Sequence, residues 1–249
     1  MLCPNGYNLD MHSSIAKQLI ELNRRFYDQF GDSFSATRQR LQPGVRKILE
    51  TIREDESVLD LGCGNGNFLR ELQKRGHKAT LRGVDFSLPL LRDAESTPGV
   101  DFREVDLTKL SAFSDQLLAV DGQWSVVTIF ATLHHIPSHE IRMDILKTVK
   151  NLLKPDGRFI LSNWQFLNSE KLKARIQPWS RVGISDDEVD NGDYLLDWRS
   201  GGEGLRYAHH FSAEELLGLA EQVGMKVEAS FLSDGENGRL GLYQVLESS

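Results

Sequence analysis

The feature that most constrains this fold is an alternation of short apolar runs with amphipathic segments through the middle of the chain. Apolar residues recur at helical spacing in residues 67–75, 88–95 and 139–153. Runs with the length of buried strands surround these segments, at residues 57–61, 80–85, 100–105, 125–131 and 158–162. Strands that alternate with helices are usually parallel, since a parallel pair needs a long crossover connection. The pattern predicts an α/β fold in which helices cover both faces of a mainly parallel sheet.

Both ends of the chain differ from this alternation. Apolar spacing predicts helices between residues 11 and 54, the first ended by Gly31 and the second begun by Pro43. Near the other end, Ser212-Ala-Glu-Glu215 is a capping box that opens a helix. Residues 226–246 then hold two apolar runs with only a turn between them. Without a crossover helix, these two runs predict an antiparallel hairpin.

The composition narrows the class of protein. The 249 residues carry a net charge of −7 and are 40% hydrophobic, which suffices for a globular core. No run approaches the roughly 18 apolar residues of a membrane helix, and the N-terminus lacks the basic and apolar segments of a secretion signal. Cys3 and Cys63 are the only cysteines, which excludes a disulfide framework or a cysteine-rich zinc site. We expect a cytoplasmic protein that binds neither membrane nor DNA and holds no metal.

A glycine-rich loop, Asp60-Leu-Gly-Cys-Gly-Asn-Gly66, joins the first predicted strand to the next helix. Its glycines allow a tight turn and a close approach of backbone N–H groups to a ligand. Their spacing departs from the G-x-G-x-x-G of dinucleotide-binding loops. The carboxylate of Asp60 would repel a pyrophosphate but attract an ammonium group. The loop is therefore either a structural turn or a site for a cationic ligand.

Two further acids follow the next strands, Asp85 after the second and Asp106 after the third. Ligands of open α/β sheets bind outside the carboxyl ends of the strands, where these acids converge. Asp85 is placed to accept both hydroxyls of a ribose, and Asp106 to accept from an adenine amino group. Either acid alone is typical of a helix cap or a solvated loop. Together with Asp60 they predict a nucleoside site.

These motifs resemble those of the class I S-adenosylmethionine-dependent methyltransferases. The likeness extends to Gly83-Val-Asp-Phe-Ser87, Phe130-Ala-Thr-Leu-His-His-Ile-Pro137 and Leu152-Leu-Lys-Pro-Asp-Gly-Arg-Phe159. It implies a Rossmann-like sheet of seven strands with a C-terminal antiparallel hairpin, S-adenosyl-L-methionine as the cofactor, and methyl transfer without a metal. The cofactor-binding residues that it implies are Asp60, Gly62, Cys63, Gly64, Gly66, Asp85, Phe86, Asp106, Leu107, Phe130 and Ala131.

The resemblance also organises the whole chain as a single methyltransferase domain. Residues 163–210 show no clear period, and a segment this long is usually a functional insertion. We expect it to lie over the carboxyl ends of the strands. The predicted parts are an N-terminal helical cap (1–54), a cofactor-binding core (55–163), an insertion that covers the acceptor site (164–210) and a C-terminal helix with hairpin (211–249).

The flanks resemble a narrower family, the tRNA wobble-uridine methyltransferases that esterify the carboxylate of 5-carboxymethyluridine. Phe26-Tyr-Asp-Gln-Phe-Gly-Asp-Ser-Phe-Ser-Ala-Thr-Arg38 is similar to the segment before their sheet, with Ser33 in place of a histidine. Arg206-Tyr-Ala-His-His-Phe211 is similar to the segment before their last helix. This resemblance implies a carboxylate acceptor on tRNA. Arg38 would hold a carboxylate, of the cofactor or of the acceptor, through two hydrogen bonds.

Several side chains are candidates for acceptor chemistry. The catalytic candidates are Tyr27, Arg38 and His135, and the candidates for acceptor binding are Trp164, Arg206, Tyr207 and His209. His135 or its neighbour could act as a base, although at least one of the two is expected to fill the loop. Residues 170–181 combine lysines and arginines with Trp179, which suits either a phosphate-binding patch or a solvated helix.

Three functions remain open at this point. The first is a methyltransferase acting on the carboxylate of a modified tRNA wobble uridine. The second is a methyltransferase for a small-molecule acid, phenol or amine. The third is a non-catalytic protein that binds S-adenosylmethionine.

Overall fold

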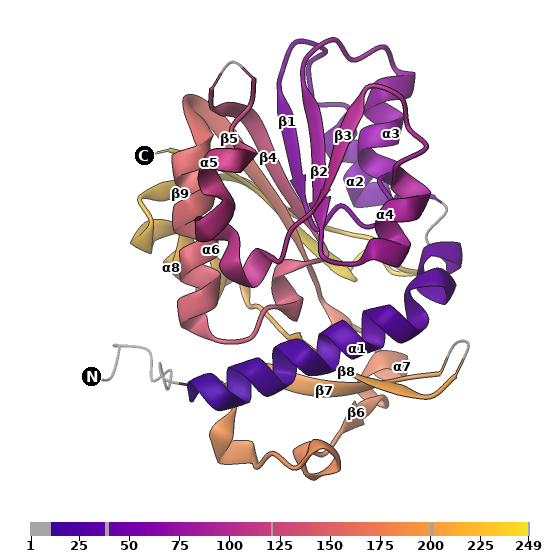
Figure 1. Cartoon of the computed structure of the whole chain (residues 1–249). Coiled ribbons are helices and arrows are strands. Elements are labelled where there is room, and N and C mark those ends of the chain that lie inside the picture. The colour runs from indigo at the N-terminus through magenta and orange to yellow at the C-terminus, as the bar shows by residue number, and fades with distance from the viewer. Residues whose placement is uncertain (1–10, 38–39, 121, 200–201, 249) are drawn as a thin grey trace.

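A seven-stranded sheet forms the centre of the protein, with the strand order β3-β2-β1-β4-β5-β10-β9 (Figure 1). The computed structural model describes residues 11–37, 40–120, 122–199 and 202–248. The strands are β1 (Val58–Leu61), β2 (Leu81–Asp85), β3 (Val100–Glu104), β4 (Trp124–Phe130), β5 (Leu153–Trp164), β9 (Met225–Ser233) and β10 (Gly241–Ser248). Neighbouring strands are parallel except that β10 is antiparallel to both β5 and β9. The mainly parallel sheet with a C-terminal antiparallel hairpin is confirmed.

The strand order reverses between β1 and β4. From β1 the chain moves through β2 and β3 to one edge, then returns to place β4 and β5 on the other side of β1. The loops that follow β1 and β4 therefore leave the sheet in opposite directions. A crevice opens between such loops, and this is where ligands of open α/β sheets bind.

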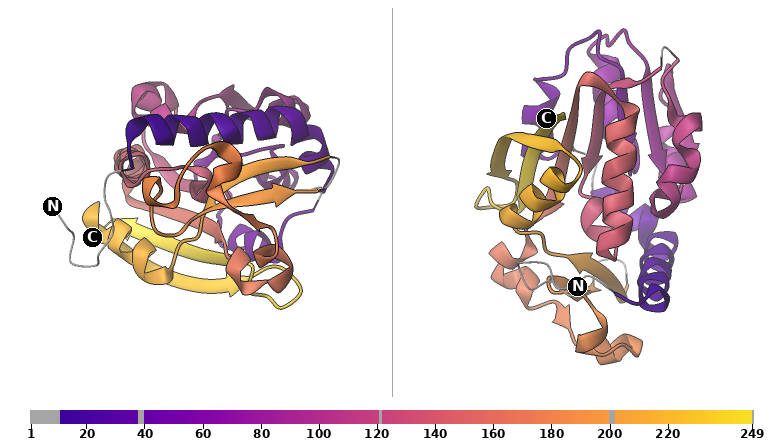
Figure 2. Two further views of the ribbon diagram at one scale, coloured as in Figure 1. Left: turned by 90° about the horizontal axis from the view of Figure 1, so that it is seen from below. Right: turned by 90° about the vertical axis from the view of Figure 1, so that its left-hand side faces the viewer.

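Helices cover both faces of the sheet, as predicted (Figure 2). Those between and after the strands are α3 (Asn67–Lys74), α4 (Leu88–Ala94), α5 (Ser114–Leu117), α6 (His139–Leu152) and α8 (Ala213–Gln222). Apolar side chains of α6 and α8 pack on one face, and those of α3 pack on the other. Ser212 caps α8, since the N–H of Glu215 donates to its Oγ at 3.1 Å. The carboxylate of Glu215 contacts Nε2 of His209 at 2.9 Å, so the second half of the predicted capping box is not seen.

The first helix, α1 (Ser13–Thr37), passes through Gly31. The prediction that Gly31 ends this helix is wrong. A glycine ends a helix by taking a positive φ, whereas Gly31 keeps the helical backbone and lies against the start of α4, where a Cβ would be 3.5 Å from Cβ of Pro89. A contact of that length is ordinary van der Waals contact, so packing against α4 does not require a glycine here. α2 (Pro43–Leu49) begins at the predicted proline.

The segment between β5 and α8 forms a small antiparallel sheet of its own. It contains α7 (Glu170–Lys173), β6 (Ile176–Gln177), β7 (Asp193–Trp198) and β8 (Gly204–His209). α1 crosses the carboxyl ends of the central strands and packs along β8 (Figures 1 and 2). The insertion thus lies at the predicted edge of the sheet. Within the described residues, no helix has the length and apolar character needed to cross a membrane.

Residues 170–181 do not form the stacking surface that a nucleic acid would need. Trp179 is buried, and its ring centroid lies 6.5 Å from that of Tyr207, in the apolar core between α1 and β8. Lys173 pairs with Glu170 at 2.7 Å. The basic groups remain at the surface, but the side chain of Trp179 is buried by packing. Of the two alternatives for this segment, the phosphate-binding patch therefore lacks its stacking side chain.

Candidate active site

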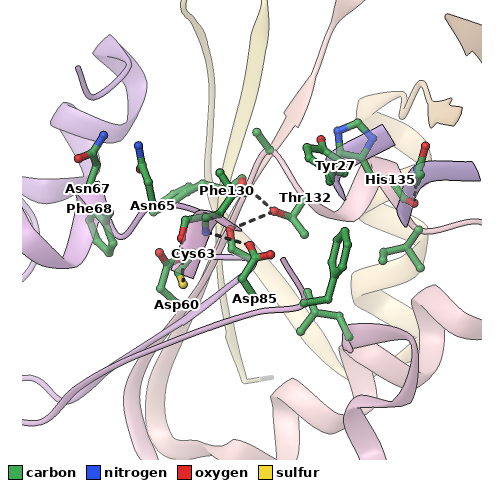
Figure 3. Close-up of a pocket in the computed structure, with 18 of the residues that line it drawn as sticks. Tyr27, Asp60, Cys63, Asn65, Asn67, Phe68, Asp85, Phe130, Thr132 and His135 are labelled. Atoms are coloured by element: carbon green, nitrogen blue, oxygen red, sulfur yellow. Dashed lines mark hydrogen bonds between the residues drawn. The ribbon is translucent and has the colours of Figure 1, made fainter. Parts of the chain in front are cut away.

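An open cavity lies at the carboxyl ends of β1, β2 and β4 (Figure 3). Loops that follow these strands form one wall, and α1 with the segment before α2 forms the other. The α1 side chains that line it recur at the i, i+3, i+4 and i+7 positions of one helix face; they are Ile20, Asn23, Arg24 and Tyr27. The N-terminal helix therefore covers the predicted nucleoside site.

The glycine loop brings bare backbone to this cavity. Gly62 and Gly64 have φ angles of 71° and 54°, in the left-handed region that favours glycine. A Cβ on Gly62 would lie 2.4 Å from Oγ1 of Thr132, whereas a Cβ on Gly64 would meet nothing within 4 Å. Gly62 is thus required by packing. Gly64 presents its backbone to open space, which allows a ligand to approach closely.

Asp85 ties this loop to the end of β2. Its Oδ2 accepts from the N–H of Gly64 and its Oδ1 from the N–H of Ser87, both at 2.9 Å. Burial raises the pKa of Asp85, and these backbone N–H groups offset part of the rise. Each carboxylate oxygen keeps a second lone pair, so Asp85 can still accept from ligand hydroxyls. Its contact with a ribose stays a prediction.

Asp60 is a buried carboxylate, 3% exposed, at the end of β1. Its Oδ1 accepts from Oγ1 of Thr128 at 2.6 Å. Burial raises the pKa of Asp60 to about 7; the Thr128 hydrogen bond lowers it and the charge of Asp85 raises it further. Among the described residues, no cationic side chain forms an ion pair with Asp60 or Asp85. A cationic ligand group in the cavity would offset the free-energy cost of burying these two charged carboxylates. Asp60 and Asp85 therefore fit the sulfonium and ammonium groups of S-adenosylmethionine.

Cys63 stands between the glycines and faces the same buried acids. Burial raises the pKa of its thiol well above the usual range, with added contributions from Asp85 and Asp60. The thiol therefore stays protonated. Cys63 lines the cavity as a small neutral residue rather than as a nucleophile.

The predicted adenine end of the cavity is closed by a contact with α1. Asp106 caps the following 3₁₀ turn, accepting from the N–H and the Oγ1 of Thr108 at 3.0 and 2.7 Å. Its other oxygen accepts from Nη2 of Arg24 at 2.9 Å. Phe86 packs edge to face against Tyr27 beside this pair. Of the eleven predicted cofactor residues, all but Gly66 line the cavity, and their individual contacts with the cofactor stay predictions.

The opposite end of the cavity is built from the loop after β4. Ala131 has a φ of 49°, a conformation that costs about 1 kcal/mol for a residue with a Cβ. Its N–H donates to both the carbonyl and the Oγ of Ser162 at 3.0 Å, which holds the turn in place. Beyond it, the ring of His135 packs edge to face against that of Tyr27, with 5.6 Å between centroids. His135 and Tyr27 both line the cavity.

None of the four predicted acceptor-binding residues of the insertion lines the cavity. Tyr207 and His209 are fully buried in a polar cluster behind it. The guanidinium of Arg206 is enclosed by aromatic rings, 4.6 Å from the ring of Trp164 and 5.4 Å from that of Phe26. These side chains face inward because the insertion has a core of its own, and in the described part of the chain the insertion supports α1 without covering the cavity itself.

The neighbouring histidines divide between packing and the cavity. His134 is buried, and its Nδ1 accepts from the N–H of Trp164 at 3.3 Å. It fills the loop, as expected of one of the two. Arg38 lies outside the described residues.

Several lining residues were missed by sequence reasoning. They are Asn23, Arg24, Arg40, Gln42, Asn65 and Thr132. Asn23 and Arg24 share a helical face with Tyr27, so the sequence groups these side chains without showing what that face packs against. Thr132 lies within the quoted motif 130–137, and no local pattern marks Arg40.

Known proteins resemble this chain over most of its length. A family model described as "Methyltransferase domain" matches residues 34–230. The Encephalitozoon cuniculi protein ECU09_1500, which is named as a methyltransferase, is 32% identical over 205 residues, covering 82% of this chain and 86% of its own. The mouse tRNA (carboxymethyluridine(34)-5-O)-methyltransferase is 25% identical over 183 residues. That alignment covers 71% of this chain but only 26% of the mouse enzyme.

Solved structures share the fold. A SAM-dependent methyltransferase from Methanosarcina mazei superposes with a TM-score of 0.63 at 23% identity, covering 84% of this chain and 98% of the other. The seven-stranded arrangement with its C-terminal antiparallel pair is therefore the arrangement of known methyltransferases.

Proposed function

We propose that this protein transfers the methyl group of S-adenosylmethionine to an oxygen or nitrogen of an acceptor bound beside His135. The chain belongs to the methyltransferase domain family. The observation that carries this proposal is the pair of buried carboxylates, Asp60 and Asp85, that meet at the glycine loop without a cationic partner among the described residues. The cofactor supplies a methyl group already activated by its sulfonium. The protein therefore needs no nucleophile of its own, and the neutral thiol of Cys63 is consistent with this.

Each part of the cavity then has one task. The backbone at Gly62 and Gly64 receives the methionine portion beside Asp60. Asp85 accepts from the ribose hydroxyls. Phe86, Asp106 and Leu107 bind the adenine, and Phe130 and Ala131 lie beside the sulfonium. Holding donor and acceptor in line and free of water is the main catalytic work of such a site.

For the acceptor, we propose the carboxylate of 5-carboxymethyluridine in tRNA. Arg24 and Arg40 are among the residues that line the cavity, and arginine pairs well with carboxylates. Arg38, predicted for the same role, belongs to the segment between them. The mouse relative acts on this kind of acceptor. A carboxylate arrives ionised, so its methylation requires no base.

A second acceptor class is favoured by a different observation. Nδ1 of His135 lies 3.1 Å from the carbonyl oxygen of Tyr207, which can only accept. The neutral ring therefore carries its lone pair on Nε2, as a general base requires. A base would serve a small-molecule phenol, alcohol or amine. Membership of an enzyme family leaves a purely binding role without support.

Cofactor binding is tested by thermal unfolding. S-adenosylmethionine should raise the Tm of the protein, because a ligand that binds only the folded state stabilises it. Asp85→Ala should abolish this rise, whereas Asp115→Ala, an exposed control, should keep it. Stabilisation by NAD but not by S-adenosylmethionine would contradict the proposal.

The acceptor is tested by mass spectrometry of tRNA nucleosides from a deletion strain and its parent. Loss of the methyl ester with accumulation of the free carboxymethyl nucleoside supports the tRNA acceptor. Binding of purified protein to that tRNA should also weaken steeply with salt. Unchanged nucleosides, together with methylation of a small phenol or amine by the purified enzyme, would establish the second class instead.

A further inference from the structure

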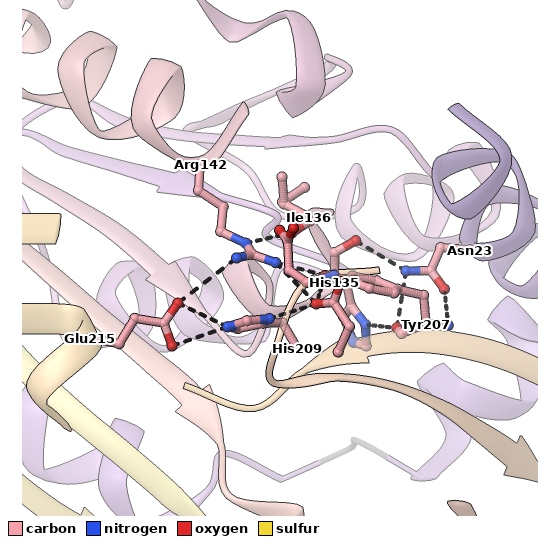
Figure 4. Close-up of polar contacts among 9 residues, drawn as sticks. Asn23, His135, Ile136, Arg142, Tyr207, His209 and Glu215 are labelled. Carbon is pink, nitrogen blue, oxygen red and sulfur yellow. Dashed lines mark hydrogen bonds and ion pairs between the residues drawn. The ribbon is translucent and has the colours of Figure 1, made fainter. Parts of the chain in front are cut away.

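His135 lies at a junction of three elements that are distant in the sequence (Figure 4). Its own 3₁₀ turn, Leu133–His135, follows β4, and its ring faces the cavity. The carbonyl of Tyr207 in β8 accepts from its Nδ1–H. Asn23 in α1 contacts both residues. The contacts of this junction determine which nitrogen of His135 carries the proton.

Asn23 uses every polar group of its side chain at this junction. Its Nδ2 donates to the carbonyl of His135 at 3.1 Å and to the carbonyl of Tyr207 at 3.2 Å. Its Oδ1 accepts from the N–H of Tyr207 at 2.8 Å. One buried amide thus fixes the backbone of His135 relative to the carbonyl that receives the proton of its ring.

Arg142 of α6 fixes the same two segments from the other side. Its Nε donates to the carbonyl of Ile136 at 2.9 Å, directly after His135. Its Nη2 donates to the hydroxyl of Tyr207 at 2.7 Å, and that hydroxyl donates to Asp193 at 2.6 Å. Both the histidine loop and the tyrosine are therefore held by one guanidinium.

His209 joins two acids of this cluster. Its Nδ1 lies 2.6 Å from Asp193, and its Nε2 lies 2.9 Å from Glu215. The guanidinium of Arg142 faces the same two carboxylates, and Asp190 is a third acid beside them. Such a hydrogen-bonded cluster is a rigid support, since removing one partner leaves a buried charge uncompensated.

We propose that Asn23, Arg142 and Tyr207 are positioning residues that hold His135 with its proton on Nδ1 and its lone pair on Nε2. The role of that nitrogen in catalysis rests on the second acceptor class of the proposed function, the phenols, alcohols and amines. For a protic acceptor, Nε2 takes the proton as the acceptor oxygen or nitrogen bonds to the methyl carbon and the carbon–sulfur electron pair remains on sulfur. The tautomer itself follows from the geometry alone.

The test is nitrogen NMR of protein labelled with ¹⁵N-histidine, which distinguishes protonated from unprotonated ring nitrogens. The neutral ring of His135, assigned with His135→Gln, should be protonated on Nδ1. His77 provides an internal reference, because its Nε2 lies 2.8 Å from the carbonyl of Glu56 and should carry the proton there. An Nε2-protonated tautomer for His135 would overturn the proposal.

Asn23→Asp tests the positioning role with little change of size. The carboxylate keeps an acceptor for the N–H of Tyr207 but places a second oxygen against two carbonyls. We expect a mixed tautomer at His135, an unchanged signal for His77 and a kcat lowered about 10- to 100-fold with a protic acceptor. The Tm rise with S-adenosylmethionine should persist.

Gln18→Ala is the matched control, because Gln18 also donates from α1, to the carbonyl of Val182, but at the surface. It should change neither the tautomer nor kcat. If Asn23→Asp does not fold, Tyr207→Phe removes only the hydroxyl between Arg142 and Asp193 and should broaden the Nδ1 signal of His135. An unaltered His135 signal in the folded variants would contradict the proposal. An absent Tm rise in the wild-type protein would contradict the proposed function and leave the tautomer standing.

Discussion

Two groups of buried or half-buried carboxylates in this protein differ in how their charge is compensated. Asp193 and Glu215, behind the cavity, meet the guanidinium of Arg142 and the ring of His209. Asp60 and Asp85, in the cavity, meet only a hydroxyl and backbone N–H groups among the described residues. We call the first group the paired cluster and the second the cavity acids. Burial alone does not mark a binding site; a buried charge that the protein itself leaves uncompensated does.

The titration behaviour of the two groups reflects this difference. Burial raises the pKa of Asp60 to about 7, because little opposes the cost of its charge. Burial also acts to lower the pKa of Arg142, but the contact with Tyr207 and the charges of Asp193 and Glu215 outweigh it, so this pKa is raised. In the paired cluster each charge stabilises the next. In the cavity the compensation must come from a ligand.

The largest change in the free energy of unfolding is expected from breaking the paired cluster. Asp193→Ala leaves Arg142 and His209 buried with one carboxylate fewer, which typically costs about 3–5 kcal/mol. Urea unfolding should show this loss. Asp186→Ala, an exposed acid of the same insertion, should change the free energy of unfolding by less than about 0.5 kcal/mol. Similar stabilities for the two variants would show that the cluster is not the compensated unit described above.

A substitution among the cavity acids is expected to raise the free energy of unfolding, by less than breaking the paired cluster lowers it. The folded pKa of Asp60 is raised, so its contribution to stability is complete below pH 4 and is lost as the pH rises toward 7. Asp60→Asn removes this titration. Between pH 5 and pH 8, the variant without ligand should gain on the order of 2 kcal/mol relative to wild type.

Unfolding in urea at both pH values measures this gain, with Asp115→Asn as the exposed control. If the difference in the free energy of unfolding between Asp60→Asn and wild type does not change with pH, Asp60 does not belong with the cavity acids as described above. Added S-adenosylmethionine should narrow this difference at pH 8, because its cationic groups stabilise the ionised carboxylate.

The smallest effect is expected where the cavity meets solvent. Arg24 pairs with Asp106, but both side chains are partly exposed, and such pairs contribute about 0–1 kcal/mol. Arg24→Ala should therefore lower the free energy of unfolding by less than about 1 kcal/mol, and less still at high salt. Calorimetry at two salt concentrations measures it. A loss as large as that of Asp193→Ala would mean that the contact between α1 and the cavity belongs with the buried pairs.

Much of the fold was predictable because its signals are local. The strands, the helix cap at Ser212 and the turn after β1 each depend on a few neighbouring residues. Gly31 was misjudged because a glycine ends a helix where it takes a positive φ, and the backbone of α1 stays helical through Gly31. The small sheet of the insertion was missed because its core is shared with α1, which is distant in the sequence.

The candidate site divides in the same way. The sequence by itself determined the cofactor wall, since parallel strands bring Asp60, Asp85 and Asp106 to one edge whatever the rest of the chain does. Only the tertiary structure decided that Tyr207 and His209 face a buried ion cluster while Asn23, Arg24 and Arg40 face the cavity. The physical reason is that hydrogen bonds between neighbouring strands place the strand ends, and each strand is specified by a short run of neighbouring residues. The direction in which a side chain of α1 or β8 points depends on which apolar surfaces pack against each other across the whole molecule.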